Sequence, residues 1–117
     1  FVSTLAGCGE QQGYADGPNV DARFDSPCDM AMDADGTVFV ADGENHCIRK
    51  VTPDGFVSTL AGCGEQQGYA DGPNVDARFD SPCDMAMDAD GTVFVADGEN
   101  HCIRKVTPDG FVSTLAG

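Results

Sequence analysis

Six cysteines carry the most reactive side chains of this sequence. They fall as three in each half of the chain: Cys8, Cys28, Cys47, Cys63, Cys83 and Cys102. No two of them form a Cys-x-x-Cys pair, so the spacing of zinc ribbons and thioredoxin-like redox sites is absent. We expect reduced thiols that pack as small apolar side chains.

Two other roles for the cysteines stay open. If the chain folds back at Pro53-Asp54-Gly55, Cys47 lies opposite Ala61, and Cys63 follows two residues later, within reach of a Cys47–Cys63 disulfide. A metal site could instead combine Cys47 with His46 or Asp42.

The other candidate catalytic groups lack suitable surroundings. His46 and His101 each follow an asparagine in a turn, where we expect them to brace the turn by hydrogen bonds rather than bind metal or transfer protons. Asp33-Ala34-Asp35-Gly36 resembles part of a calcium loop, but the remaining ligands are absent and a hairpin turn explains the pattern. No serine has a Gly-x-Ser-x-Gly context, and no glycine cluster opens a long helix. The sequence therefore predicts no catalytic residue and no cofactor.

An internal repeat organises all of these residues. Residues 1–55 recur letter for letter as residues 56–110, and residues 111–117 restate the opening FVSTLAG. Identity over 55 residues indicates a recent duplication or a designed or reconstructed sequence, and we favour design. We expect an extra outer strand at 1–7, a first unit at 8–62 and a second unit at 63–117.

The charge balance excludes several classes of partner. The chain has 20 acidic and 6 basic residues, a net charge of −14. Nucleic acids and anionic membranes are bound through Lys and Arg, so neither is an expected partner. No apolar run approaches the roughly 18 residues of a membrane span. No targeting signal is visible, and the cellular location stays open.

Each repeat predicts four short strands joined by tight turns. The strands are expected at residues 29–33, 37–41, 47–51 and 56–61, separated by Asp-Gly, Gly-Glu-Asn and Pro-Asp-Gly turns. The first two are continuously apolar, which indicates burial on both faces, whereas Arg49, Lys50, Ser58 and Thr59 indicate partial exposure of the last two. Such a sheet must stack against copies of itself, as the blades of a β-propeller do.

The long connection between successive meanders should also be ordered. About twenty residues, 62–82, separate the fourth strand from the next unit. Pro73 should open one helical turn, and Phe79 should pack against a blade edge while the chain crosses from the rim back to the axis.

The repeat resembles an NHL repeat. The resemblance is carried by Val38-Phe39-Val40-Ala41-Asp42, by Asn45-His46 and by Ile48-Arg49-Lys50-Val51, and it extends over the whole unit. It departs from the family at Cys28 and Cys47. The resemblance implies an all-β propeller, usually of six blades, and some propellers of this kind are lyases or hydrolases with a metal at the axis.

Two blades alone cannot close a ring, because each end would expose an apolar face and an unpaired edge. We therefore expect a homo-oligomer: a trimer giving six blades, or a tetramer giving eight as the second choice. The spare FVSTLAG either completes the last blade of a neighbouring chain or is displaced. Because the chains repel one another, assembly should tighten with added salt.

Asp29 and Asp84 begin the innermost strands and could point toward the axis of such a ring. Their copies would then form an acidic ring able to hold a cation or ordered water. Identical blades, however, cannot supply the different groups that an acid, a base and a substrate clamp require. We therefore expect a self-assembling structural scaffold, with a ligand- or protein-binding module as the alternative and a metal-dependent lyase or hydrolase as a more remote one.

Overall fold

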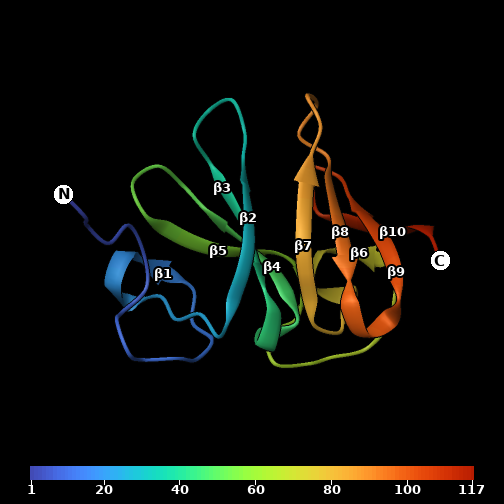
Figure 1. The fold of residues 1–117 in the computed structure, drawn as a ribbon, viewed down its shortest axis with the longest axis horizontal. Coiled ribbons are helices and arrows are strands. Elements are labelled where there is room, and N and C mark those ends of the chain that lie inside the picture. Colours follow the sequence, from blue (N-terminus) through green and yellow to red (C-terminus); the bar gives the residue numbers. More distant parts are fainter.

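The structure is a computed structural model that describes all residues, 1–117. The chain forms two antiparallel sheets of five strands that stand side by side, with the termini at opposite ends of the molecule (Figure 1). None of the helices is long and apolar enough to cross a membrane.

Each sheet is one propeller blade. The first has the order β1-β5-β4-β3-β2 and the second the order β6-β10-β9-β8-β7. The strands of the first blade are β1 (Gly17–Pro18), β2 (Pro27–Met32), β3 (Val38–Asp42), β4 (Cys47–Val51) and β5 (Phe56–Gly62). Those of the second are β6 (Gly72–Pro73), β7 (Pro82–Met87), β8 (Val93–Asp97), β9 (Cys102–Val106) and β10 (Phe111–Ala116). The predicted all-β propeller fold and its four-stranded meander are confirmed.

A fifth, outermost strand was not predicted. Gly17 pairs with Val57, and Gly72 pairs with Val112 in the second blade. A Gly-Pro dipeptide has no intrinsic preference for strands, so this pairing arises only once the long loop lies along the outer edge of the blade.

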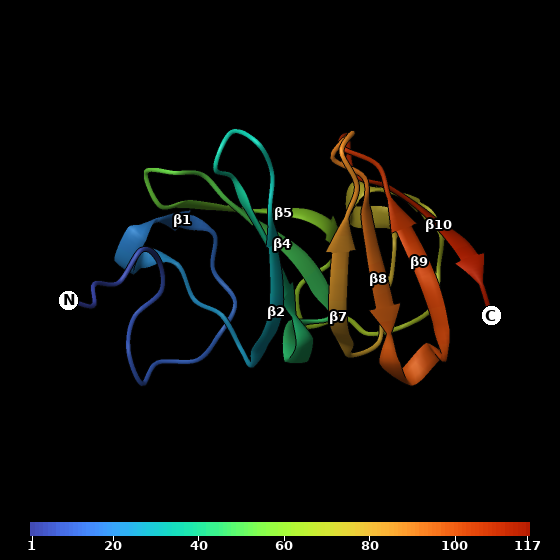
Figure 2. The same ribbon diagram turned by 45° about the horizontal axis from the view of Figure 1, so that its top comes forward.

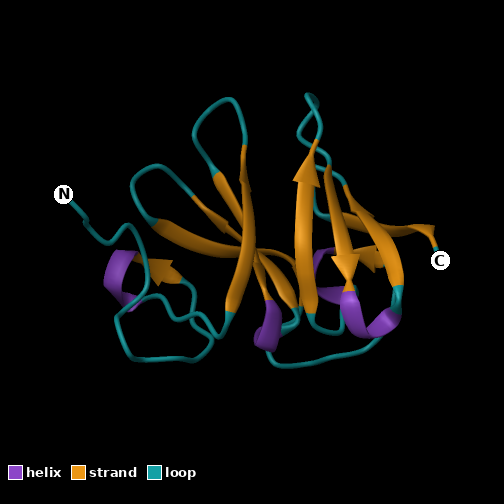
Figure 3. Ribbon diagram, viewed as in Figure 1, coloured by secondary structure: helices purple, strands orange, loops and turns teal.

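The turns follow the local chemistry of the sequence. Short 3₁₀ helices occupy η1 (Asn19–Asp21), η2 (Gly43–Asn45), η3 (Asn74–Asp76) and η4 (Gly98–Asn100) (Figure 3). The helical turn expected after Pro73 is thus confirmed. The carboxylate of Asp33 accepts hydrogen bonds from the backbone N–H groups of Asp35 (2.9 Å) and Thr37 (3.0 Å), so it closes a hairpin.

Residues 1–7 form no strand in the single chain. The expected outer strand at this position, with possible exchange between chains, stays a prediction. Their strand partner in a propeller would be the third strand of a preceding blade, and no blade precedes the first one here.

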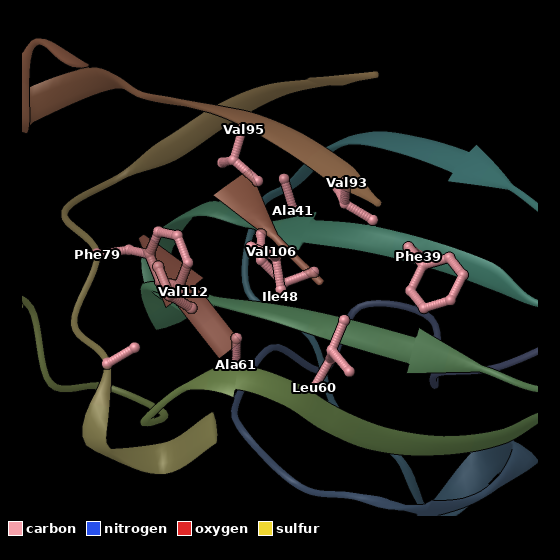
Figure 4. Close-up of a cluster of buried hydrophobic side chains, with 11 residues drawn as sticks. Phe39, Ala41, Ile48, Leu60, Ala61, Phe79, Val93, Val95, Val106 and Val112 are labelled. Atoms are coloured by element: carbon pink, nitrogen blue, oxygen red, sulfur yellow. The ribbon is translucent and has the colours of Figure 1, made fainter. Parts of the chain in front are cut away.

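The inner strands of the two blades, β2 and β7, lie next to each other at the centre of the molecule in two views (Figures 1 and 2). The main hydrophobic core fills the space between the two sheets and contains 11 buried residues (Figure 4). A smaller cluster of 4 residues lies on the other side of the first blade. The inner strands were expected to be buried on both faces. In the single chain each blade packs against another blade on one face only.

Candidate assembly interface

A buried arginine ties the long loop of each blade to its sheet. Arg49 donates from Nη1 to Asp42 Oδ2 (2.7 Å) and from Nη2 to Asp16 Oδ1 (2.8 Å). Its guanidinium lies between the rings of Tyr14 and Phe24, 4.7 and 4.9 Å from their centroids. The predicted partial exposure of Arg49 is therefore wrong: the loop folds over the side chain and buries it completely.

The second blade repeats this arrangement. Arg104 pairs with Asp97 (2.7 Å) and Asp71 (2.9 Å) and lies between Tyr69 and Phe79. The arginine network of each blade is thus formed by groups of that blade alone.

This network uses Asp42, one of the two residues that could join Cys47 in the alternative metal site. The two oxygens of Asp42 accept hydrogen bonds from the N–H of Asp25 (2.9 Å) and from Asn45 (2.8 Å), in addition to Arg49. Burial raises the pKa of Asp42, while the hydrogen bonds from Asn45, the Asp25 amide and Arg49 oppose that rise. The structure contains no group of three or more His, Cys, Asp or Glu that could hold a metal ion around Cys47 with His46 or Asp42.

The six cysteines are free thiols in the structure, and the Cys47–Cys63 disulfide is not formed. A bulge in β5 shifts the register, so that Cys47 lies opposite Gly62 and not Ala61. Cys47 is completely buried, and this burial raises the pKa of its thiol. It fills the role of a small core side chain.

Asp29 and Asp84 do meet where the inner strands touch. Asp29 Oδ2 accepts a hydrogen bond from the N–H of Met85 at 2.7 Å. Two hydrogen bonds lower the pKa of Asp29. The one with the Asp84 carboxyl group has the larger effect, and the one from the N–H of Met85 the smaller. An acidic ring remains a prediction for a closed propeller, because one chain supplies only these two members.

His46 connects the two blades. Its Nδ1 accepts a hydrogen bond from the N–H of Ser81 at 2.9 Å and lies 3.8 Å from Asp80 Oδ1. Sequence reasoning predicted bracing of its own turn, whereas the histidine braces the entry to the next blade. His101, its copy, has no following blade and is exposed.

The apolar junction between the blades has two different sides. The first blade contributes one set of residues, which we call the forward face: Phe39, Ala41, Ile48, Leu60 and Ala61. The second blade contributes the opposite set, its backward face: Ala77, Phe79, Val93, Val95, Val106 and Val112. Figure 4 shows these side chains pointing toward one another from both sheets. The predicted packing of Phe79 against a blade is confirmed, since its side chain is fully buried here.

The same two faces recur at the ends of the molecule, where no further blade packs on them. The forward face of the second blade exposes Ile103 by 38% and Leu115 by 59%. The backward face of the first blade forms a groove of about 330 Å³ lined by Phe24, Val38, Val40 and Val51 among others. Because the repeats are identical, these end faces carry the same residues as the packed junction.

Comparisons with known proteins agree with this architecture. A model described as "NHL repeat" matches residues 24–51 and 79–106, which span β2–β4 and β7–β9. NHL repeat-containing protein 2 of Bos taurus is 32% identical over 97% of this chain. The chain spans 17% of the length of that relative.

Solved structures show the same fold. A protein of unknown function from Bacteroides thetaiotaomicron has a TM-score of 0.80 at 34% identity, over 86% of this chain and 26% of its own. An auxiliary nutrient binding protein of the same organism has a TM-score of 0.79 at 30% identity, over 94% of this chain and 28% of its own. A streptogramin B lyase shares the fold alone, at 14% identity, over 78% of this chain and 26% of its own, with a TM-score of 0.59. The chain therefore consists of two NHL repeats, folded as adjacent blades of a β-propeller.

Proposed function

We propose that this chain is a structural unit that closes a propeller ring by binding further copies of itself, and that it has no catalytic activity of its own. One observation carries the proposal: the forward face packs on the backward face inside the chain, and at the ends of the chain the same two faces have no neighbouring blade. The forward face of the second blade is exposed there, and only the N-terminal residues cover the backward face of the first. Two copies can therefore repeat the internal junction residue for residue.

Contacts of this type allow a closed assembly. A contact between two different faces is heterologous, and repeated heterologous contacts form a ring when the rotation per unit closes. We propose a trimer with six blades, the usual number for the family that the repeat resembles, with a tetramer of eight blades as the second choice.

Symmetry supports a scaffold rather than an enzyme. The buried network of the first blade recurs in the second with the same partners, so a ring of such blades presents equal side chains at equivalent positions. A constellation of unlike catalytic groups would require unlike blades. The identity of the repeats also supports a designed or reconstructed origin.

Native mass spectrometry under reducing conditions tests the proposal. We expect the mass of three chains, and added salt should shift assembly to lower protein concentration because the acidic chains repel one another. The variant Ile103→Asp places a charge on the open forward face and should abolish assembly, whereas Gln67→Asp adds the same charge on an exposed loop and should not. A monomer at every concentration and salt level would overturn the proposal.

A binding module is the second candidate function. It is favoured by the similarity, at 30% identity, to a solved protein named for auxiliary nutrient binding. Screening the assembled ring against small nutrients by thermal shift would test it, and a saturable rise in Tm would support it.

A further inference from the structure

The heptapeptide FVSTLAG occurs three times, and its first and second copies contact the following blade in the same way. Asn19 donates from Nδ2 to the carbonyl oxygen of Leu5 at 3.2 Å. In the second blade Asn74 donates to the carbonyl oxygen of Leu60 at 3.0 Å. Residues Leu5–Gly7, which we call the N-terminal plug, therefore lie on the first blade where the end of β5 lies on the second.

Two further contacts confirm this equivalence. Ala6 packs against the small cluster of the first blade, as Ala61 is part of the main core on the second. A Cβ atom at Gly55 would come within 2.7 Å of the Leu5 oxygen, and one at Gly110 within 2.7 Å of the Leu60 oxygen. The plug thus occupies a site on the backward face of the first blade. We call this site the seat; it includes Asn19, Gly55 and the small cluster that Ala6 packs against.

In a ring, the same seat must receive another segment. The internal junction seats Leu60–Gly62 on the second blade, so a junction between copies would seat Leu115–Gly117 of the neighbouring copy on the first. The plug and the end of the incoming β10 have the same sequence, Leu-Ala-Gly, and would bind to the same site on the first blade. They therefore cannot both be bound there.

The two competitors differ in how firmly they are held. β10 pairs along its length with β9 and also with β6 within its own blade. The residues before the plug pair with nothing, and the side chains of Phe1 and Val2 are fully exposed. β10 should therefore keep its place in its own blade and enter the seat as part of that blade.

Resting on the self-association proposed above, we propose that residues 1–7 are a built-in competitor of assembly: the N-terminal plug covers the seat in the free chain, and β10 of a neighbouring copy displaces it. A seat that is open in only a fraction of the molecules lowers the apparent affinity by that fraction. The proposal thus predicts that loosening the plug strengthens assembly.

Equivalent substitutions in the repeated heptapeptide test this by their opposite signs. Ala6→Glu weakens the plug and should lower the concentration at which half of the chains assemble by more than tenfold, because each of the three contacts of a trimer gains the roughly tenfold expected for a seat covered about nine-tenths of the time. Ala116→Glu puts the same charge on the incoming strand and should raise that concentration. Gln67→Glu, on an exposed loop, is the control for the added charge, which by itself opposes assembly. Sedimentation velocity over a concentration series measures all three.

Deleting residues 1–7 is the second variant and should strengthen assembly as Ala6→Glu does. Circular dichroism should show an unchanged sheet in both, because the plug lies outside the strands. If Ala6→Glu and the deletion weaken assembly, the N-terminal copy completes the neighbour's blade by strand exchange, and the proposal is overturned. Unchanged assembly in both also overturns it. If neither the parent chain nor any variant assembles, it is the proposed self-association that fails.

Discussion

The two blades have the same sequence, yet equivalent residues differ in burial. Ile48 on the forward face of the first blade is fully buried, whereas its copy Ile103 is 38% exposed. Leu60 is 8% exposed and its copy Leu115 is 59% exposed. The difference in burial arises because one face packs against a neighbouring blade and the other does not. It therefore separates the contacts that form within a blade from those that require a second blade.

The interior of each blade belongs to the first category. Arg49 and Arg104 each make four hydrogen bonds of 2.7–2.9 Å to equivalent partners. Phe39 and Phe94, on the forward faces, belong to the second category, since only the first is buried.

Substitutions in the arginine network should cause the largest losses of stability, and the loss should be equal in the two blades. Replacing Arg49 or Arg104 by Met leaves a buried carboxylate without its partner, which costs about 3–5 kcal/mol. We expect each variant to lower the free energy of unfolding by the same amount, measured by urea denaturation followed by circular dichroism. A large inequality between the two would show that the network also depends on the junction.

The forward face should give unequal effects. Ile48→Ala opens a cavity in the packed junction and should cost about 2–5 kcal/mol in urea denaturation. Ile103→Ala should cost about 1 kcal/mol or less in the unassembled chain, because its side chain is already partly in water. At concentrations where copies associate, the cost of Ile103→Ala should approach that of Ile48→Ala. Equal costs in the monomer would contradict the assignment of the open face.

Sequence reasoning predicted the parts of this fold that local chemistry determines. Turns at Asp35-Gly36 and Pro53-Asp54-Gly55 delimit the strands, and the apolar run of β3 identifies the inner part of the blade. The helical turn after Pro73 also follows from its own residues.

The wrong predictions concern residues whose burial or strand register depends on segments distant in the sequence. Arg49 reads as a surface residue until the loop with Tyr14 and Asp16 folds over it. The residue opposite Cys47 on β5 is shifted by one position because β5 contains a bulge. The alternation of apolar and polar residues does not predict such a bulge. The role of His46 could have been noticed in principle: a histidine in a repeat recurs at every blade junction, where a neighbouring backbone comes within reach.

The histidines give a smaller test of the same comparison. His46→Ala leaves the half-buried N–H of Ser81 without its acceptor and should cost about 1 kcal/mol. His101→Ala should change the stability of the unassembled chain little, because no blade follows it. Thermal unfolding of the two variants measures the difference, and an equal loss of Tm in both would argue against the bond that joins the blades.

The smallest effect is expected at the turns that both blades have in common, residues 52–55 and 107–110. The hydroxyl group of Thr52 donates to the carboxylate of Asp54, and Thr107 does the same for Asp109. These bonds lower the pKa of both carboxyl groups from 3.8, since they favour the charged form. Stability from a carboxyl group with a lowered pKa is present above pH 3.8 and is lost as the pH falls through its value in the folded chain.

Carboxyl titration by NMR should therefore give midpoints below 3.8 for both Asp54 and Asp109, and the same value for each. Thr52→Val should raise the midpoint of Asp54 alone, and Thr107→Val that of Asp109 alone, with no change in assembly. Both turns have the same contacts: the Asn19 side chain donates to the carbonyl oxygen of Asp54 at 3.2 Å, and the Asn74 side chain donates to that of Asp109 at 3.0 Å. A difference between the two midpoints would therefore mean that the blades differ beyond the exposure of their faces, and the separation of blade interior from blade face would have to be redrawn.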